Sequence, residues 1–201
     1  PEVLAYLKTN LEGLASHYHA LYQAEGLEDD KPANYTEALV WYRAFHTSIP
    51  QVEQSPGINY QRADLLLENG DFGDAAREYE RTAYGYAAHE RASAAGYAAI
   101  FAHREQLKGS AEELQPELKR ATVVSSLKFA DTFPEHEHAA VVLTAAAEDL
   151  YALADYAPAA TAGRALIARY ATAEPALRRT AWTVVAHSWF GLADYQAAAP
   201  A

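Results

Sequence analysis

The sequence predicts an all-α protein built from helix pairs that are joined by short turns. Alanine dominates its apolar residues, and alanine costs the least free energy to place in a helix. No stretch shows the sustained alternation of apolar and polar residues, bounded by turn residues, that predicts a strand. A turn-and-helix pattern also returns along the chain, which indicates an internal repeat.

The clearest copy of the repeat is NGDFGDAAREYE at residues 69–80, in which a turn leads to Phe72, Ala75 and Tyr79. The arrangement returns as Tyr156, Ala159 and Gly163, as Tyr195 and Ala198, and more weakly as Tyr35, Ala38 and Tyr42. Small residues at facing positions let two helix backbones approach closely, and the aromatic residues fill the space between pairs. One pair cannot bury its apolar stripe alone, so stacked pairs are predicted.

Apolar spacing and helix-breaking residues place the helices. The first one carries apolar residues from Leu4 to Leu21 at a 3-4-3-4-3 spacing, which puts them on one face. We expect Asn34 to cap the second helix, Pro50 to close it, and Pro116 to open the regular part of the sixth. The predicted helices cover residues 2–24, 34–45, 58–68, 72–84, 91–108, 112–132, 136–154, 157–171 and 176–192, and a last one starts at Tyr195.

Charge and residue usage narrow the functional classes. The chain has 16 basic and 27 acidic side chains and a net charge of −11, and such a surface repels nucleic-acid phosphates. It has no cysteine, which excludes disulfides, thiolate zinc sites and cysteine nucleophiles. No apolar run reaches the roughly 20 residues that span a bilayer. We therefore expect no nucleic-acid partner and no membrane insertion by this chain.

Both ends of the chain indicate a piece of a longer protein. It opens on Pro1 without a methionine and stops just after Ala198, where a helix is predicted to be starting. We therefore expect that a targeting segment, if there is one, lies outside this sequence.

The repeat resembles the tetratricopeptide repeat (TPR), a family in which antiparallel helix pairs stack into a right-handed superhelical solenoid. The family's second helix opens on an aromatic residue, followed by a small residue three positions later. A bulky residue comes four positions after that, and a proline eight further on. The first unit meets all four positions with Tyr35, Ala38, Tyr42 and Pro50. The second unit lacks the proline, and the third is degenerate.

The resemblance implies a single helical-repeat domain over residues 1–201. Its units are about 2–50, 56–88, 89–134, 136–175 and a truncated 176–201. First helices of the family carry a small residue twelve positions before the alanine of the second helix, as Ala63, Ala147 and Ala186 do here. The units advance by 37 residues from Tyr35 to Phe72 and by 39 from Tyr156 to Tyr195, against a usual period of about 34.

Slightly long repeats that end near a proline are similar to those of bacterial envelope proteins of the BamD and Tol-Pal coordination protein type. This likeness favours a periplasmic or outer-membrane-associated location over a cytoplasmic one.

The residues offer little that predicts catalysis. His136 and His138 are two positions apart, whereas a helical metal pair needs a spacing of four, so a polar first turn of a helix is expected there. Neighbouring carboxylates such as Glu148 and Asp149 supply neither a shared cleft nor shifted pKa values by adjacency alone. We expect no enzyme activity, no metal and no cofactor.

The resemblance implies a binding surface on the concave face, at about the fifth, ninth, twelfth and thirteenth positions of each repeat. The candidates are Tyr60, Asp64, Leu67 and Glu68 in the second unit, Tyr97 and Phe101 in the third, Thr144, Glu148 and Tyr151 in the fourth, and Thr183, His187 and Phe190 in the fifth. Aromatic side chains offer contact area at low entropy cost, and acidic neighbours favour a basic or amine-bearing segment. Burial of Tyr97 and Phe101 between repeats is an equal alternative.

We therefore expect a non-catalytic scaffold that binds a peptide segment or a partner domain, in a setting such as bacterial envelope assembly. The alternative is a structural segment of a larger protein that extends a solenoid or forms a homo-oligomer and has no peptide ligand of its own.

Overall fold

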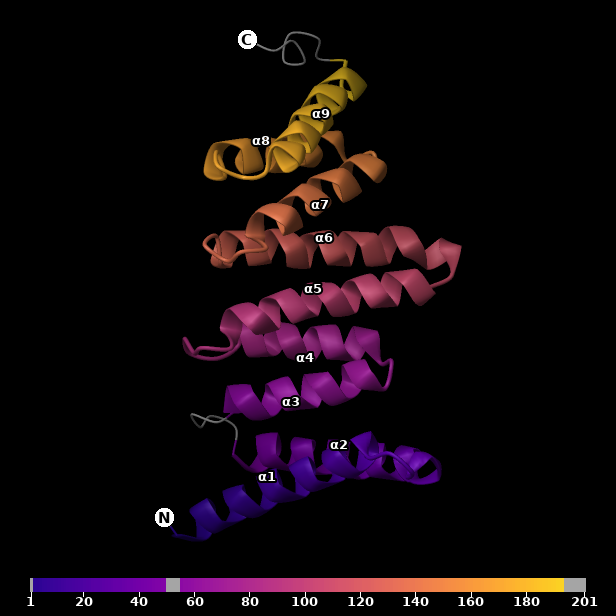
Figure 1. Ribbon diagram of the computed structural model, residues 1–201, viewed down its shortest axis with the longest axis vertical. Coiled ribbons are helices and arrows are strands. Elements are labelled where there is room, and N and C mark those ends of the chain that lie inside the picture. The colour runs from indigo at the N-terminus through magenta and orange to yellow at the C-terminus, as the bar shows by residue number, and fades with distance from the viewer. Residues whose placement is uncertain (1, 50–54, 194–201) are drawn as a thin grey trace. The chain divides into compact units, whose positions relative to one another are not determined.

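The computed structural model describes residues 2–49 and 55–193, and every regular element in these ranges is a helix (Figure 1). The α-helices are α1 (Glu2–Gln23), α2 (Lys31–Ser48), α3 (Ser55–Glu68), α4 (Phe72–Tyr84), α5 (Ala92–Gly109), α6 (Gln115–Thr132), α7 (Ala139–Ala152), α8 (Tyr156–Arg169) and α9 (Pro175–Gly191). Short 3₁₀ turns, η1 (Glu28–Asp30) and η2 (Glu112–Leu114), precede α2 and α6. The predicted all-α class and the pairing of successive helices are confirmed for these residues.

The chain divides into two compact parts, residues 1–102 and 103–201, and the boundary lies within α5. The single domain over residues 1–201 stays a prediction.

The N-terminal part consists of two helix hairpins and the first half of α5. Helix α1 packs on α2, and α3 packs on α4. Their shared core joins all five helices and consists of Leu11, Ala15, Ala38, Leu39, Tyr42, Phe45, Ile58, Ala63, Leu65, Leu66, Ala75, Ala76, Tyr79, Ala99 and Ala102. The N-terminal part therefore buries small and aromatic residues together.

The C-terminal part stacks α6, α7, α8 and α9, and α7 also contacts α9 directly. Neighbouring helices reverse direction here, so that α7 and α9 run the same way (Figure 1). The core is smaller in side-chain volume and consists of Val123, Ala130, Leu143, Ala147, Leu150, Ala159, Ala162, Leu166, Ala181 and Val184.

Alanine lies at the closest helix contacts, as the repeat predicts. Ala38, Ala75 and Ala159 each have 0% of their surface exposed. Four positions later, Tyr42 and Tyr79 are buried, and the C-terminal part has Gly163 at that position. A Cβ on Gly163 would lie 2.7 Å from Val185 Cγ2, so α8 approaches α9 too closely for any larger residue there.

The turn that opens the second helix has the same geometry in both parts. In the α3–α4 turn the N–H of Gly70 donates to the carbonyl of Leu67 (3.1 Å), and in the α7–α8 turn that of Ala154 donates to Tyr151 (2.9 Å). Both turn residues are left-handed, with φ of +84° and +60°. The conformation suits glycine and strains alanine.

Two predicted helix starts are wrong. Helix α2 begins at Lys31 and not at Asn34, because Pro32 fits the first turn, and Asn34 is buried inside the helix. Helix α7 begins at Ala139, so the segment from His136 to His138 is a turn before the helix and not its first turn. Pro50 and the predicted helix at Tyr195, with Ala198, lie outside the described residues.

His46, on α2, is a buried basic residue with no hydrogen-bond partner among the described residues. It is 7% exposed, and no described residue hydrogen-bonds either ring nitrogen. Burial, together with the charges of Arg81 and Arg62, lowers its pKa from 6.5 to about 4. The folded chain therefore binds the His46 proton more weakly than the unfolded chain does.

Exchanging the two turn residues tests the equivalence of the turns. Gly70→Ala is expected to destabilise the N-terminal part by about 1 kcal/mol, because the Cβ has free space but the backbone is left-handed. Ala154→Gly is expected to stabilise the C-terminal part by about 0.5–1 kcal/mol, since relieved strain exceeds the added unfolded-state entropy. Urea unfolding of both variants measures this, and the same sign of change for both would contradict it.

Acid should weaken the N-terminal part through His46. The folded pKa of about 4 lies below the unfolded value, so His46 costs no stability above about pH 6.5 and up to about 3 kcal/mol as pH falls to 4. A His46→Gln variant should lose less stability than wild type between pH 7 and pH 4.5 in urea unfolding. Equal pH dependence of the two proteins would show that His46 is not held neutral.

Candidate functional site

The structure separates most of the twelve predicted binding residues into two groups, one in each part. Tyr60, Asp64 and Glu68 lie along α3 and take part in contacts within the N-terminal part. Leu67 is half-buried and packs against the core there. The second group lies on α7 and α9 in the C-terminal part.

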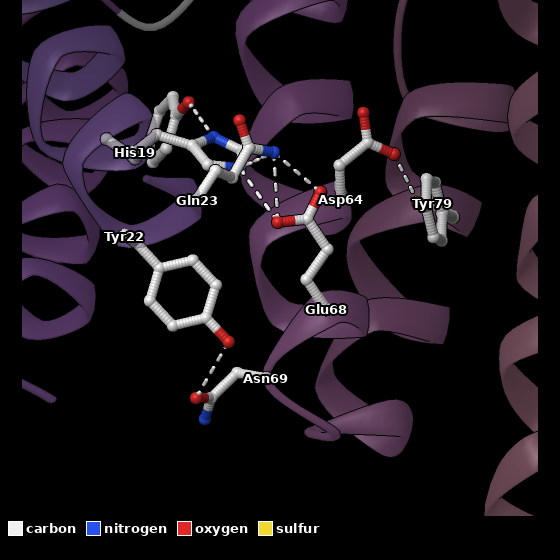
Figure 2. A network of polar contacts seen from close by, with 8 residues as sticks. His19, Tyr22, Gln23, Asp64, Glu68, Asn69 and Tyr79 are labelled. Atoms are coloured by element: carbon white, nitrogen blue, oxygen red, sulfur yellow. Dashed lines mark hydrogen bonds and ion pairs between the residues drawn. The ribbon is translucent and has the colours of Figure 1, made fainter. Parts of the chain in front are cut away.

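A polar network joins the first two hairpins, and we call it the α1–α3 network (Figure 2). His19 on α1 is buried, and its Nδ1 shares a hydrogen bond with the Tyr42 hydroxyl (2.8 Å). The Gln23 amide donates to both carboxylate oxygens of Glu68 at 2.8 and 3.0 Å. Tyr22 donates to the Asn69 side chain at 3.3 Å. Glu68 therefore ties α3 to α1.

Asp64 is occupied in the same way. It is half-buried and accepts a short hydrogen bond from the hydroxyl of the buried Tyr79. Burial raises the pKa of Asp64, while the Tyr79 donor acts in the opposite direction. The Tyr60 ring packs against the Tyr79 ring with centroids 5.2 Å apart, and the Arg91 guanidinium lies 5.6 Å from the Tyr60 ring centre. Asp64 and Tyr60 thus hold α3 to α4, and Glu68 holds α3 to α1.

The second group lines an open cavity of about 460 Å³, which we call the α7–α9 groove. Its lining residues are Glu148 and Tyr151 of α7 with Arg179, Thr180, Thr183, Val184 and His187 of α9. Four of them, Glu148, Tyr151, Thr183 and His187, are among the residues predicted from the sequence. Helix periodicity brings them together, since α9 presents positions 179, 183 and 187 on one face.

Aromatic rings form one end of the α7–α9 groove. The Tyr151 and His187 rings lie 6.0 Å apart at 45°, and the Tyr156 ring lies 5.5 Å from that of Tyr151. Tyr156 therefore supports the Tyr151 ring, and Tyr151 is still 36% exposed. A supported, exposed ring is a low-entropy contact surface.

Two charges of opposite sign complete the groove. Neither Glu148 nor Arg179 forms an ion pair with another residue in the described ranges 2–49 and 55–193, and both are exposed. The neighbouring Asp149, by contrast, pairs with Arg104 (2.6 Å) and lies 3.9 Å from Lys119. A ligand can therefore pair with Glu148 or Arg179 without breaking an ion pair within the described residues.

The other candidates lie outside this groove. Thr144 is only 4% exposed and donates to the Ala140 carbonyl (2.8 Å), so it cannot form part of a binding surface, and its assignment is corrected. Phe190 is 65% exposed but does not line the cavity. Tyr97 and Phe101 are exposed on α5, at 38% and 51%, which favours the surface alternative over burial.

Sequence reasoning missed Arg179, Thr180 and Val184. They lie one turn before, or next to, the predicted Thr183 and His187 on α9. Extending the helical face by one turn would have included them, whereas the family positions alone did not.

The described residues include no group of three or more histidine and acidic side chains that could hold a metal ion. His136 and His138 do lie close together, with ring centroids 5.5 Å apart, and the backbone N–H of His138 donates to His136 Nδ1 at 3.2 Å. Burial lowers the pKa of His136, and the neighbouring His138 lowers it further. Among the described helices, none is long and apolar enough to cross a bilayer.

Removing one tyrosine hydroxyl in each part distinguishes a residue that stabilises the fold from a residue that lines the open groove. Tyr79→Phe is expected to cost about 1–2 kcal/mol of unfolding free energy, because the half-buried Asp64 loses its donor. Tyr151→Phe should change stability by less than about 0.5 kcal/mol, since its ring packing is kept and the residue is 36% exposed. Urea unfolding measures both, and equal losses would contradict the distinction.

No protein-family model and no curated protein matches the chain. Among solved structures, the crystal structure of BtubC (BKLC) from P. vanneervenii is similar at 14% identity and a TM-score of 0.44, and the match covers 97% of this chain and 86% of that one. At this level the likeness carries no argument about function, which rests on the geometry described above.

Proposed function

We propose that this chain is a non-catalytic protein-interaction scaffold that binds a peptide segment in the α7–α9 groove. One observation carries the proposal: Glu148, Tyr151, Thr183 and His187 line a single open cavity on two neighbouring helices. Asp64 and Glu68, the corresponding residues on α3, already bond to Tyr79 and Gln23. The group on α7 and α9 is therefore the one that we propose for binding.

The groove has the properties that peptide recognition requires. Its volume of about 460 Å³ falls within the range of ligand pockets, roughly 300–1,000 Å³. Tyr151 and His187 supply aromatic contact area, and Thr180 and Thr183 carry hydroxyl groups at the wall. A rigid pair of helices fixes these groups before binding, which lowers the entropy cost of association.

Bacterial envelope assembly is the setting that we propose for this binding, on the ground of the long repeat units. The partner would be a peptide segment or an exposed segment of a folded domain.

Self-association is a second candidate function, and exposed apolar residues favour it. Val3 and Tyr6 on α1, and Trp182 and Phe190 on α9, are all more than half exposed. Exposed apolar side chains on two different helices would allow copies of the chain to associate.

Selection from a random peptide display library tests the proposed function. Wild-type chain should enrich a family of peptides, and the Tyr151→Ala, His187→Ala double variant should lose at least tenfold of that enrichment, because the aromatic end of the groove is removed. Trp182→Ala is the matched control, since it removes an exposed aromatic ring from α9 that does not line the cavity.

Enrichment that survives in the double variant, or that falls equally in Trp182→Ala, would remove the groove from the account. A wild-type chain that enriches no peptide but whose mass in solution rises with concentration would favour self-association instead.

A further inference from the structure

The lining residues of the α7–α9 groove can be placed along its length. Helices α7 and α9 run in the same direction, because each is antiparallel to α8 between them (Figure 1). The ring contact of Tyr151 with His187, at 6.0 Å, puts these two residues at the same level. The rise per residue of an α-helix then gives the level of every other lining residue.

The two free charges lie at different levels. Glu148 is three residues before Tyr151, about 4.5 Å along α7, and Arg179 is eight residues before His187, about 12 Å along α9. The levels of the Glu148 and Arg179 backbone positions therefore differ by about 7.5 Å. Glu148 is the charged residue nearer in level to Tyr151 and His187, and Arg179, next to Thr180 in the chain, lies farther from them.

A ligand with charge of only one sign would be repelled by either Glu148 or Arg179 in this groove. A cation next to Glu148 and the rings gains a carboxylate partner and a cation–π contact but shares the cavity with Arg179. An anion at Arg179 shares it with Glu148. A ligand that carries both signs, spaced by about 7.5 Å, satisfies both groups without introducing an unpaired charge.

An extended peptide comes close to this spacing. Its residues advance about 3.3 Å each, and side chains at positions i and i+2 point to the same side about 6.6 Å apart. We infer that the α7–α9 groove takes an extended segment with an acidic and a basic residue at alternate positions. The acidic side chain pairs with Arg179, and the basic one with Glu148 against Tyr151 and His187. This inference rests on the proposed function, which it makes specific.

Capped pentapeptides test the inference on the full chain. Gly-Glu-Gly-Arg-Gly and Gly-Arg-Gly-Glu-Gly present the pair in both chain directions, and titration followed by amide chemical shifts in NMR gives the dissociation constants. We expect at least one of them to bind. Replacing its Arg or its Glu by Gln should weaken binding about threefold to fivefold, the effect typical of an exposed ion pair.

A double-mutant cycle assigns each charge to its partner. Glu148→Gln should weaken the Glu/Arg peptide about threefold to fivefold but leave the peptide with Gln in place of Arg unchanged. Arg179→Gln should do the same with respect to the peptide Glu. Arg164→Gln, an exposed arginine on α8 outside the cavity, is the control and should change nothing.

The signs of these changes decide the outcome. Tighter binding by Arg179→Gln would mean a purely cationic ligand, tighter binding by Glu148→Gln a purely anionic one, and either result overturns the inference. Failure of both peptides to bind also overturns it. The proposed function then stands if the display library still enriches peptides without the charge pair, and falls with the inference if the library enriches none.

Discussion

Close approach of helix backbones is the constraint on which the rest of the structure depends. Ala38, Ala75 and Ala159 are fully buried where paired helices meet, and Gly163 lies where even a methyl group would collide with Val185. At such distances the small residues contribute little contact area of their own. Tyr42 and Tyr79 fill the remaining space in the N-terminal part, where their hydroxyls need buried partners.

This need for partners explains why the predicted binding residues on α3 differ from those in the α7–α9 groove. In the N-terminal part, the buried Tyr42 and Tyr79 bond to His19 and Asp64, and Gln23 donates to Glu68, so Asp64 and Glu68 on α3 are occupied by internal contacts. The C-terminal part has Gly163 in place of the equivalent tyrosine, so no tyrosine hydroxyl at that position engages a residue of the α7–α9 groove. Glu148, Tyr151 and His187 consequently stay open to a partner. The same repeat thus places residues that hold the fold together on α3 and residues that line an open cavity on α7 and α9.

Much of the fold could be predicted from the sequence, because helix period and turn residues are local signals. Helix α4 matches its predicted bounds, and Ala38, Ala75 and Ala159 lie where the repeat places them. The start of α2 could not be predicted from Asn34, since an N-cap residue and a buried helical asparagine look alike until Pro32 is placed. The groove residues were only partly predictable: family positions indicate a helix face, but whether Asp64 or Glu148 is free depends on a tyrosine from another helix.

Under the proposed function, ligand binds on α7 and α9 and not on α3. Intermolecular nuclear Overhauser effects between a bound peptide and the side chains of the chain measure this directly. We predict that peptide protons give such effects to the rings of Tyr151 and His187 and none to Tyr60. Contacts to Tyr60 and to the side chain of Glu68, with none to Tyr151, would show that the α1–α3 network opens to bind and would contradict the account.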